Sequence, residues 1–114
     1  MPMSPKEVLA QLESNVPKIV KALPDVAKPF FQGLLPNALK DGVLSKKQKE
    51  LIALALAVQM NNEFCVCRHV KWCYEAGGTK EEMVEALGVA MLFGGGPSMS
   101  YASYAMQAME ELAE

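Results

Sequence analysis

Residues 61–73 read Asn61-Asn62-Glu63-Phe64-Cys65-Val66-Cys67-Arg68-His69-Val70-Lys71-Trp72-Cys73, and they hold all three cysteines and the single histidine of the chain. Asparagine is a favoured N-cap, so Asn61 or Asn62 can start a helix here. Gly77-Gly78 follows the stretch, and glycine is typical just past a helix C-terminus. These flanking signals predict one helix that starts after the asparagines and runs to about Ala76.

The secondary structure of this stretch decides which chemistry it can support. In a helix, Cys65, His69 and Cys73 lie within about 80° of one another, whereas Cys67 lies about 200° from Cys65. In an extended strand, Cys65, Cys67 and His69 would share a face and could bind a metal ion. The helix prediction therefore disfavours a metal site, and the sequence contains no second cluster of metal ligands.

Other helix signals extend along the chain in both directions. Residues 4–7, 45–48 and 79–82 each pair a Ser or Thr with a Glu or Gln three residues later, which is the pattern of a capping box. Breaks are expected at residues 15–17, at the turn Asp41-Gly42 and at residues 94–97, and Pro36 is expected to bend or end its helix. No segment resembles a strand hairpin. The sequence thus predicts an all-α fold of about six helices, with residues 1–114 forming a single domain.

Two apolar segments carry expectations about packing. Residues 51–58 are apolar on every side of a helix, so this helix is expected to be buried all round. The last helix, from about residue 97 to residue 112, has an apolar face broader than one small core needs, which favours contact between subunits.

Composition narrows the class of protein. With 11 basic and 13 acidic residues the formal net charge is −2, which argues against nucleic acid as a partner. The longest apolar runs, residues 51–58 and 86–93, are too short to span a membrane, and the first residues do not resemble a signal peptide. An odd number of cysteines does not fit a secreted disulfide framework. We therefore expect a cytoplasmic protein with reduced thiols.

The predicted helix gives Cys65 a special position. It would lie in or near the first turn, where the helix dipole favours the thiolate, and His69 would follow one turn later on the same face. A thiol beside an imidazole suits a nucleophilic or redox-active site. The alternative is that Cys65 is a small buried residue and His69 a hydrogen-bonded core histidine. Cys73 lies too far from Cys65 for a disulfide, and it is expected in the core together with Trp72.

Several segments together resemble the carboxymuconolactone decarboxylase family. They are Lys49-Glu50-Leu51-Ile52-Ala53-Leu54-Ala55, Cys65, His69-Val70 and Glu75-Ala76-Gly77-Gly78-Thr79-Lys80-Glu81-Glu82-Met83-Val84-Glu85-Ala86-Leu87. The resemblance covers roughly residues 24–94. Within the family, the sequence most resembles the branch that contains the AhpD-type alkylhydroperoxidases. It implies an all-α fold, homo-trimers or homo-hexamers, and no metal or organic cofactor. It also implies that Cys65 reacts with a peroxide or a disulfide while Glu50 and His69 move protons.

The chain departs from this family pattern at one position. The redox branch has a Cys-x-x-Cys pair, and its first cysteine would fall on position 62, which here is Asn62. Cys67 could resolve an oxidised Cys65 in a strained Cys-x-Cys pair, an external thiol could do so, or redox function could be lost. Without the resemblance, Glu50 would be interpreted as a solvated acid near Lys46.

Three functions follow from these observations. The first is a cysteine-dependent oxidoreductase that acts on a small-molecule peroxide or on a thiol or disulfide carrier, and it predicts a lowered pKa for Cys65. The second is a lyase such as a lactone decarboxylase, which cationic and aromatic residues converging on a pocket would support; Arg68 and His69 are the available candidates. The third is a non-catalytic oligomeric binding protein with a degenerate site.

Overall fold

Helices make up nearly all of the part of the chain that the structure, a computed structural model, describes, namely residues 3–113. In chain order they are α1 (Pro5–Ala22), α2 (Pro24–Pro29), the π-helical turn η1 (Phe30–Leu34), α3 (Leu35–Leu39), α4 (Lys46–Gln59), α5 (Glu63–Glu75) and α6 (Lys80–Leu112). Residues 3–113 contain no strand, so the predicted all-α class is confirmed.

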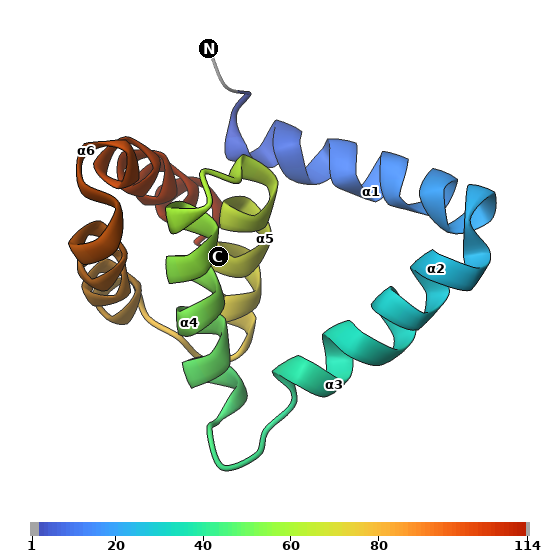
Figure 1. Cartoon of the computed structure of the whole chain (residues 1–114). Helices are drawn as coiled ribbons and strands as arrows, with labels where there is room; N and C mark the ends of the chain where they lie inside the picture. The colour runs from blue at the N-terminus through green and yellow to red at the C-terminus, as the bar shows by residue number, and fades with distance from the viewer. Residues whose placement is uncertain (1–2, 114) are drawn as a thin grey trace.

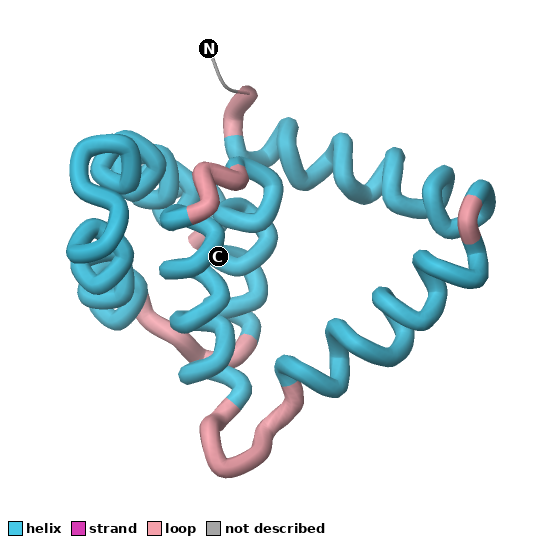
Figure 2. The backbone as a smooth tube through the Cα atoms, in the orientation of Figure 1, coloured by secondary structure: helices cyan, strands magenta, loops and turns pink. Residues whose placement is uncertain are grey.

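The helices form a bundle and an arm (Figure 1). The bundle consists of α4, α5 and α6, which pack against one another. The first turns of α1 also join it, where Val8 is fully buried. The rest of α1 then leads away from the bundle, and α2, η1 and α3 return toward the start of α4. Figure 2 shows that short loops join the bundle helices, while a longer one links α3 to α4.

The predicted capping boxes form at all three positions. The side chains of Ser4, Ser45 and Thr79 each accept a hydrogen bond from the backbone N–H three residues later. In return, the side chains of Glu7, Gln48 and Glu82 accept one from the backbone N–H of the capping residue. These reciprocal bonds satisfy N–H groups that a helix otherwise leaves without partners at its start. The first residues of α1, α4 and α6 therefore agree with the prediction.

The predictions for the arm were less accurate. A break at residues 15–17 was wrong, because α1 continues through Pro17 to Ala22. Of the two outcomes expected at Pro36, a bend or an end of the helix, the end does not occur, since α3 runs on to Leu39. A proline removes one backbone hydrogen bond but keeps a helical φ. The π-helical turn at 30–34 widens the helix just before Pro36, where its ring would otherwise crowd a carbonyl of the preceding turn.

The packing of α4 and α6 also departs in part from expectation. The helix α4 is not buried all round, because Ile52 and Leu56 are about half exposed, at 49% and 56%. Only the face toward α5 and α6 is covered. The break expected at residues 94–97 is present as a kink, since Gly95 has φ 62° and ψ −137°. Beyond this kink the stripe Ala102, Ala105, Ala108 and Met109 is buried in the core of the bundle.

Candidate active site on helix α5

The segment with the three cysteines is a helix, as predicted. Asn62 is the N-cap of α5, and its side-chain oxygen accepts a hydrogen bond from the backbone N–H of Cys65 at 3.1 Å. Gly77, with φ 89°, lies just past the C-terminus. Cys65 therefore lies in the first turn. The strand required for a shared metal site of Cys65, Cys67 and His69 does not form.

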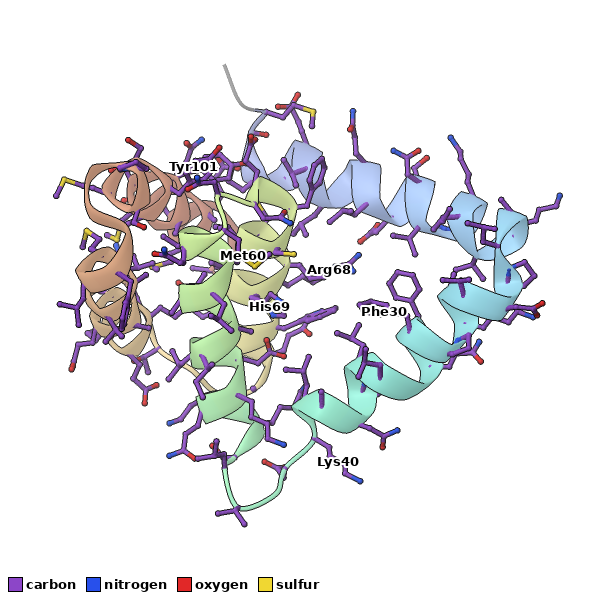
Figure 3. All side chains as sticks on the ribbon, viewed as in Figure 1. Phe30, Lys40, Met60, Arg68, His69 and Tyr101 are labelled. Carbon is purple, nitrogen blue, oxygen red and sulfur yellow. The ribbon has the colours of Figure 1, made fainter. Side chains whose placement is uncertain are left out.

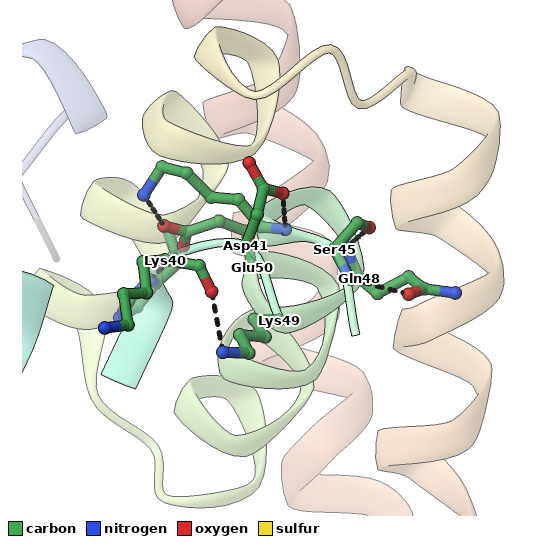
Figure 4. A network of polar contacts seen from close by, with 8 residues as sticks. Lys40, Asp41, Ser45, Gln48, Lys49 and Glu50 are labelled. Atoms are coloured by element: carbon green, nitrogen blue, oxygen red, sulfur yellow. Dashed lines mark hydrogen bonds and ion pairs between the residues drawn. The ribbon is translucent and has the colours of Figure 1, made fainter. Parts of the chain in front are cut away.

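The structure brings Glu50 of α4 next to His69 of α5. The His69 Nδ1 and Glu50 Oε1 atoms are 2.7 Å apart, and the Glu50 side chain is fully buried. The second carboxylate oxygen of Glu50 is 3.4 Å from the Lys46 Nζ (Figure 4). Proximity to Lys46 was expected, but a solvated Glu50 was wrong. Packing of α4 against α5 turns this acid inward, onto the histidine.

This pairing sets the protonation pattern of the imidazole. When Glu50 is ionised, its carboxylate only accepts hydrogen bonds, and the bond to His69 then has its proton on Nδ1. The other ring nitrogen, Nε2, is then free to take up or release a proton. The His69 side chain is 13% exposed, so a small part of it is open to solvent. A buried carboxylate behind a histidine is the arrangement that orients an acid–base imidazole.

Cys65 lies at the edge of the bundle rather than in its interior. It is half-buried and lines a cavity of about 250 Å³ together with Leu12, Asn62, Phe64 and Arg68. Among residues 3–113, no hydrogen bond joins the Cys65 thiol to His69 one turn later. Burial raises the pKa of the Cys65 thiol, and the positive charge of Arg68 opposes this effect. The expected lowered pKa is therefore wrong, because the loss of hydration outweighs the nearby cation.

The other two cysteines belong to the core. Cys67 is fully buried, and its thiol donates to the Tyr104 hydroxyl over 3.5 Å, which in turn donates to the carbonyl of Met3 at 2.8 Å. Cys73 is fully buried against Gly78, as expected. Burial raises the pKa of both thiols to about 11. Neither thiol is ionised near neutral pH, and all three cysteines are free.

Trp72 is the one residue beside the site that was not predicted as part of it. The Arg68 guanidinium lies over the Trp72 ring, 5.2 Å from its centroid, and the His69 and Trp72 rings meet edge to face at 5.4 Å. Trp72 was expected in the core but is only partly buried. Figure 3 shows Arg68 and His69 extending toward the side on which Phe30 of the arm lies. The i, i+4 spacing of Arg68 and Trp72 is the signal that could have indicated this pair.

Comparison with known proteins identifies the family. The sequence model of the carboxymuconolactone decarboxylase family matches residues 24–110. The chain belongs to this family. The crystal structure of the apo form of a carboxymuconolactone decarboxylase family protein from Legionella pneumophila superposes with a TM-score of 0.90 and 37% identity, over 96% of this chain and 97% of that one.

Two other proteins that are similar to this chain are uncharacterised. One, from Cupriavidus necator, is 40% identical over 75% of this chain and 76% of its own length. The other, encoded in the cox locus of Paracoccus denitrificans, is 30% identical over 86% of this chain and 94% of its own length.

Within residues 3–113, none of the helices combines the length and apolar character needed to cross a bilayer.

Proposed function

We propose that the protein is a cysteine-dependent oxidoreductase of the AhpD-like kind, in which Cys65 reduces a hydroperoxide. Because burial raises the pKa of Cys65, the thiol must first give its proton to a base, for which we propose His69. The Cys65 thiolate then attacks the outer peroxide oxygen, the O–O bond breaks, and His69 returns the proton to the departing alkoxide. Cys65 becomes a sulfenic acid and the peroxide becomes an alcohol. An external thiol then forms a mixed disulfide with Cys65 and releases water, and a second thiol returns Cys65 to its reduced form.

The observation that carries this proposal is the contact between Glu50 and His69. A fully buried acid is paired at 2.7 Å with a histidine that lies one helical turn from a first-turn cysteine. Such a pair can deliver a proton to a leaving oxygen and take one from an incoming thiol. These three residues are also the ones that the family resemblance assigns to the proton relay.

The buried positions of Cys67 and Cys73 favour an external resolving thiol. In the regular helix α5 the side chains of Cys65 and Cys67 diverge, and Cys67 is occupied with Tyr104. A Cys65–Cys67 disulfide would require the first turn of α5 to unwind. Small thiols and thiol carriers are abundant in the cytoplasm, the compartment to which we assign the protein.

The first test is a titration of the reduced protein with hydrogen peroxide, followed by intact mass and peptide mapping. We expect a sulfenic acid on Cys65 that a dithiol reverses, and no comparable reaction at Cys67 or Cys73. The control variant Cys65→Ser should lose the fast reaction, whereas Cys73→Ala should keep it. If Cys65 reacts no faster than a cysteine in a short peptide, the redox function is excluded and a binding role gains support.

Restoring the missing family cysteine tests the resolver. In Asn62→Cys, peroxide should produce a disulfide between the introduced thiol and Cys65 instead of a stable sulfenic acid, because the two positions have the usual Cys-x-x-Cys spacing. Asn62→Ser keeps a capping oxygen without a thiol and serves as the control. A wild-type Cys65–Cys67 disulfide under the same conditions would contradict the external resolver.

A lyase remains the second candidate, because cationic and aromatic residues do converge beside the site. Arg68 and Trp72 lie together next to His69, and such a group can hold the carboxylate of a lactone. The two functions differ in their need for sulfur. Turnover of a carboxylated lactone that survives in Cys65→Ser would support the lyase over the peroxidase.

The proposed working form is a homo-trimer or homo-hexamer. An apolar cavity of about 480 Å³ lies between α4 and the first part of α6, lined by residues that include Leu56, Val89 and Phe93. The arm of the same chain also carries exposed apolar side chains, at Leu23, Val26, Phe30 and Leu34. A second copy of the chain can cover both surfaces. Sedimentation equilibrium should show an oligomer that Leu56→Glu dissociates and Glu85→Gln does not.

A further inference from the structure

The cavity beside Cys65 contains the chain's only arginine. Arg68 lines the cavity with Cys65, three residues earlier on the same face of α5, and with Leu12 of α1 and Phe64. Within residues 3–113, no carboxylate forms an ion pair or hydrogen bond with Arg68; the ion pairs there involve Lys46, Lys47 and His69. A guanidinium has five N–H donors, and none of those of Arg68 donates a hydrogen bond within residues 3–113.

The position of this guanidinium is restrained by its neighbours. It lies over the Trp72 ring at 5.2 Å, and the His69 ring holds Trp72 from the side. Stacking on an aromatic face limits the rotamers of arginine while leaving its N–H edges available. A held arginine therefore loses less conformational entropy when a planar anion binds than a free surface lysine would.

We propose that this cavity is a carboxylate-binding subsite, so that the substrate of Cys65 is a small acid with a short apolar part. Its carboxylate would bind the Arg68 guanidinium, and its apolar part would lie on Leu12 and Phe64. Its reactive oxygen or sulfur would then be placed at the Cys65 thiol. This inference rests on the proposed role of Cys65, but it concerns which reagents reach that thiol.

Alkylation with a matched pair of reagents tests the subsite. Iodoacetate and iodoacetamide have nearly the same shape and both react with the thiolate, but only iodoacetate carries a carboxylate. The ratio of their rate constants at Cys65, measured by peptide mapping, is therefore independent of the thiolate fraction. Relative to a cysteine in a short peptide, we expect this ratio to be higher by roughly threefold to tenfold in the wild-type protein.

Variants assign the effect to Arg68. Arg68→Gln should return the ratio to the peptide value, and Arg68→Lys should restore part of it. Lys71→Gln removes one positive charge of α5 that lines a different cavity, with Leu9 and Glu111, and it should leave the ratio unchanged. An unchanged ratio in Arg68→Gln, or an equal fall in Lys71→Gln, would overturn the proposal. Because alkylation needs no peroxide, Cys65 can fail as a peroxidase while the subsite is present, and the reverse also holds.

Discussion

The two faces of α5 place the same residue type in opposite environments. On one face, Cys65 and Arg68 line a cavity, and His69 and Trp72 are only partly buried. The other face carries Cys67 and Val70, which are fully buried, and Cys73, about 80° from Cys65, is fully buried at the edge of this face. Thiols only two residues apart therefore have different access to reagents. The side of the helix on which a cysteine lies therefore determines whether its thiol is accessible to a substrate, as Cys65 is and Cys67 is not.

Removing the acid behind the reactive face should have the largest effect. Glu50→Gln keeps an oxygen that can accept from His69 but loses the charge that fixes and supports the imidazole. Proton transfer of this kind contributes roughly 100-fold or more to a rate. We expect oxidation of Cys65 by peroxide to slow by about that factor, as measured by stopped-flow mixing and intact mass.

Two variants calibrate this result. Lys46→Gln removes the weaker partner of Glu50, at 3.4 Å, and should slow the reaction much less. Glu85→Gln changes an exposed acid on α6 and should have no effect. Wild-type rates in Glu50→Gln would show that the buried pair is structural, and that the reactive face works without it.

The buried face should respond through stability instead. A Cβ at Gly78 would lie 2.3 Å from the Cys73 sulfur and 2.9 Å from the Cys73 carbonyl oxygen, so backbone must move. Gly78→Ala should therefore lower the free energy of unfolding by about 1–3 kcal/mol. Gly88→Ala, at an open position of α6, should raise it by about 0.5–1 kcal/mol. Urea unfolding monitored by circular dichroism checks both values, and equal effects of the two alanines would contradict the packing.

The sequence predicted the local features of both faces because they depend on short-range chemistry. Capping by Ser45, Asn62 and Thr79 follows from hydrogen bonds within a few residues, and the helical period then separates Cys65 from Cys67. The contact of Glu50 with His69 could not be derived in this way. It depends on how α4 packs against α5, and periodicity contains no information about that packing.

The electrostatic prediction failed for a related reason. Position in the first turn of α5 suggested a lowered pKa for Cys65, but the extent of burial is a tertiary property, and it raises that pKa instead. The arm shows the same limit. Pro17 was expected to interrupt a helix and Pro36 to bend or end one, yet the helical backbone passes both. Local propensity gives the cost of a proline in a helix, and packing decides whether the chain accepts that cost.

Alkaline pH should weaken the buried face selectively. Cys67 and Cys73 have folded-state pKa values of about 11, whereas thiols in the unfolded chain ionise near pH 9.0. Between these values the unfolded state releases protons that the folded state keeps, so stability falls as pH rises. The slope should reach about 1 kcal/mol per pH unit for each thiol.

Comparison with the double variant Cys67→Ala, Cys73→Ala separates this effect from the titration of lysines and tyrosines. Its urea midpoint should change less between about pH 8.5 and about pH 10.5 than that of the wild-type protein. Parallel pH profiles for the two proteins would mean that the buried thiols ionise as readily as exposed ones. In that case the buried thiols would differ from Cys65 only in their accessibility to reagents, and not in their pKa.

The smallest effect should come from replacing Asn62, the N-cap of α5. Asn62 caps α5 by accepting from the Cys65 N–H at 3.1 Å, so Asn62→Ala should cost about 1 kcal/mol of unfolding free energy, and Asn62→Ser only a fraction of that. The lost bond lies directly at Cys65, and fraying of this turn would let Cys65 and Cys67 approach. Asn62→Ala should therefore form some Cys65–Cys67 disulfide with peroxide, detected by peptide mapping, while Asn62→Ser should not. A disulfide absent from both variants would show that the hold of Tyr104 on Cys67, rather than the cap, keeps the two thiols apart.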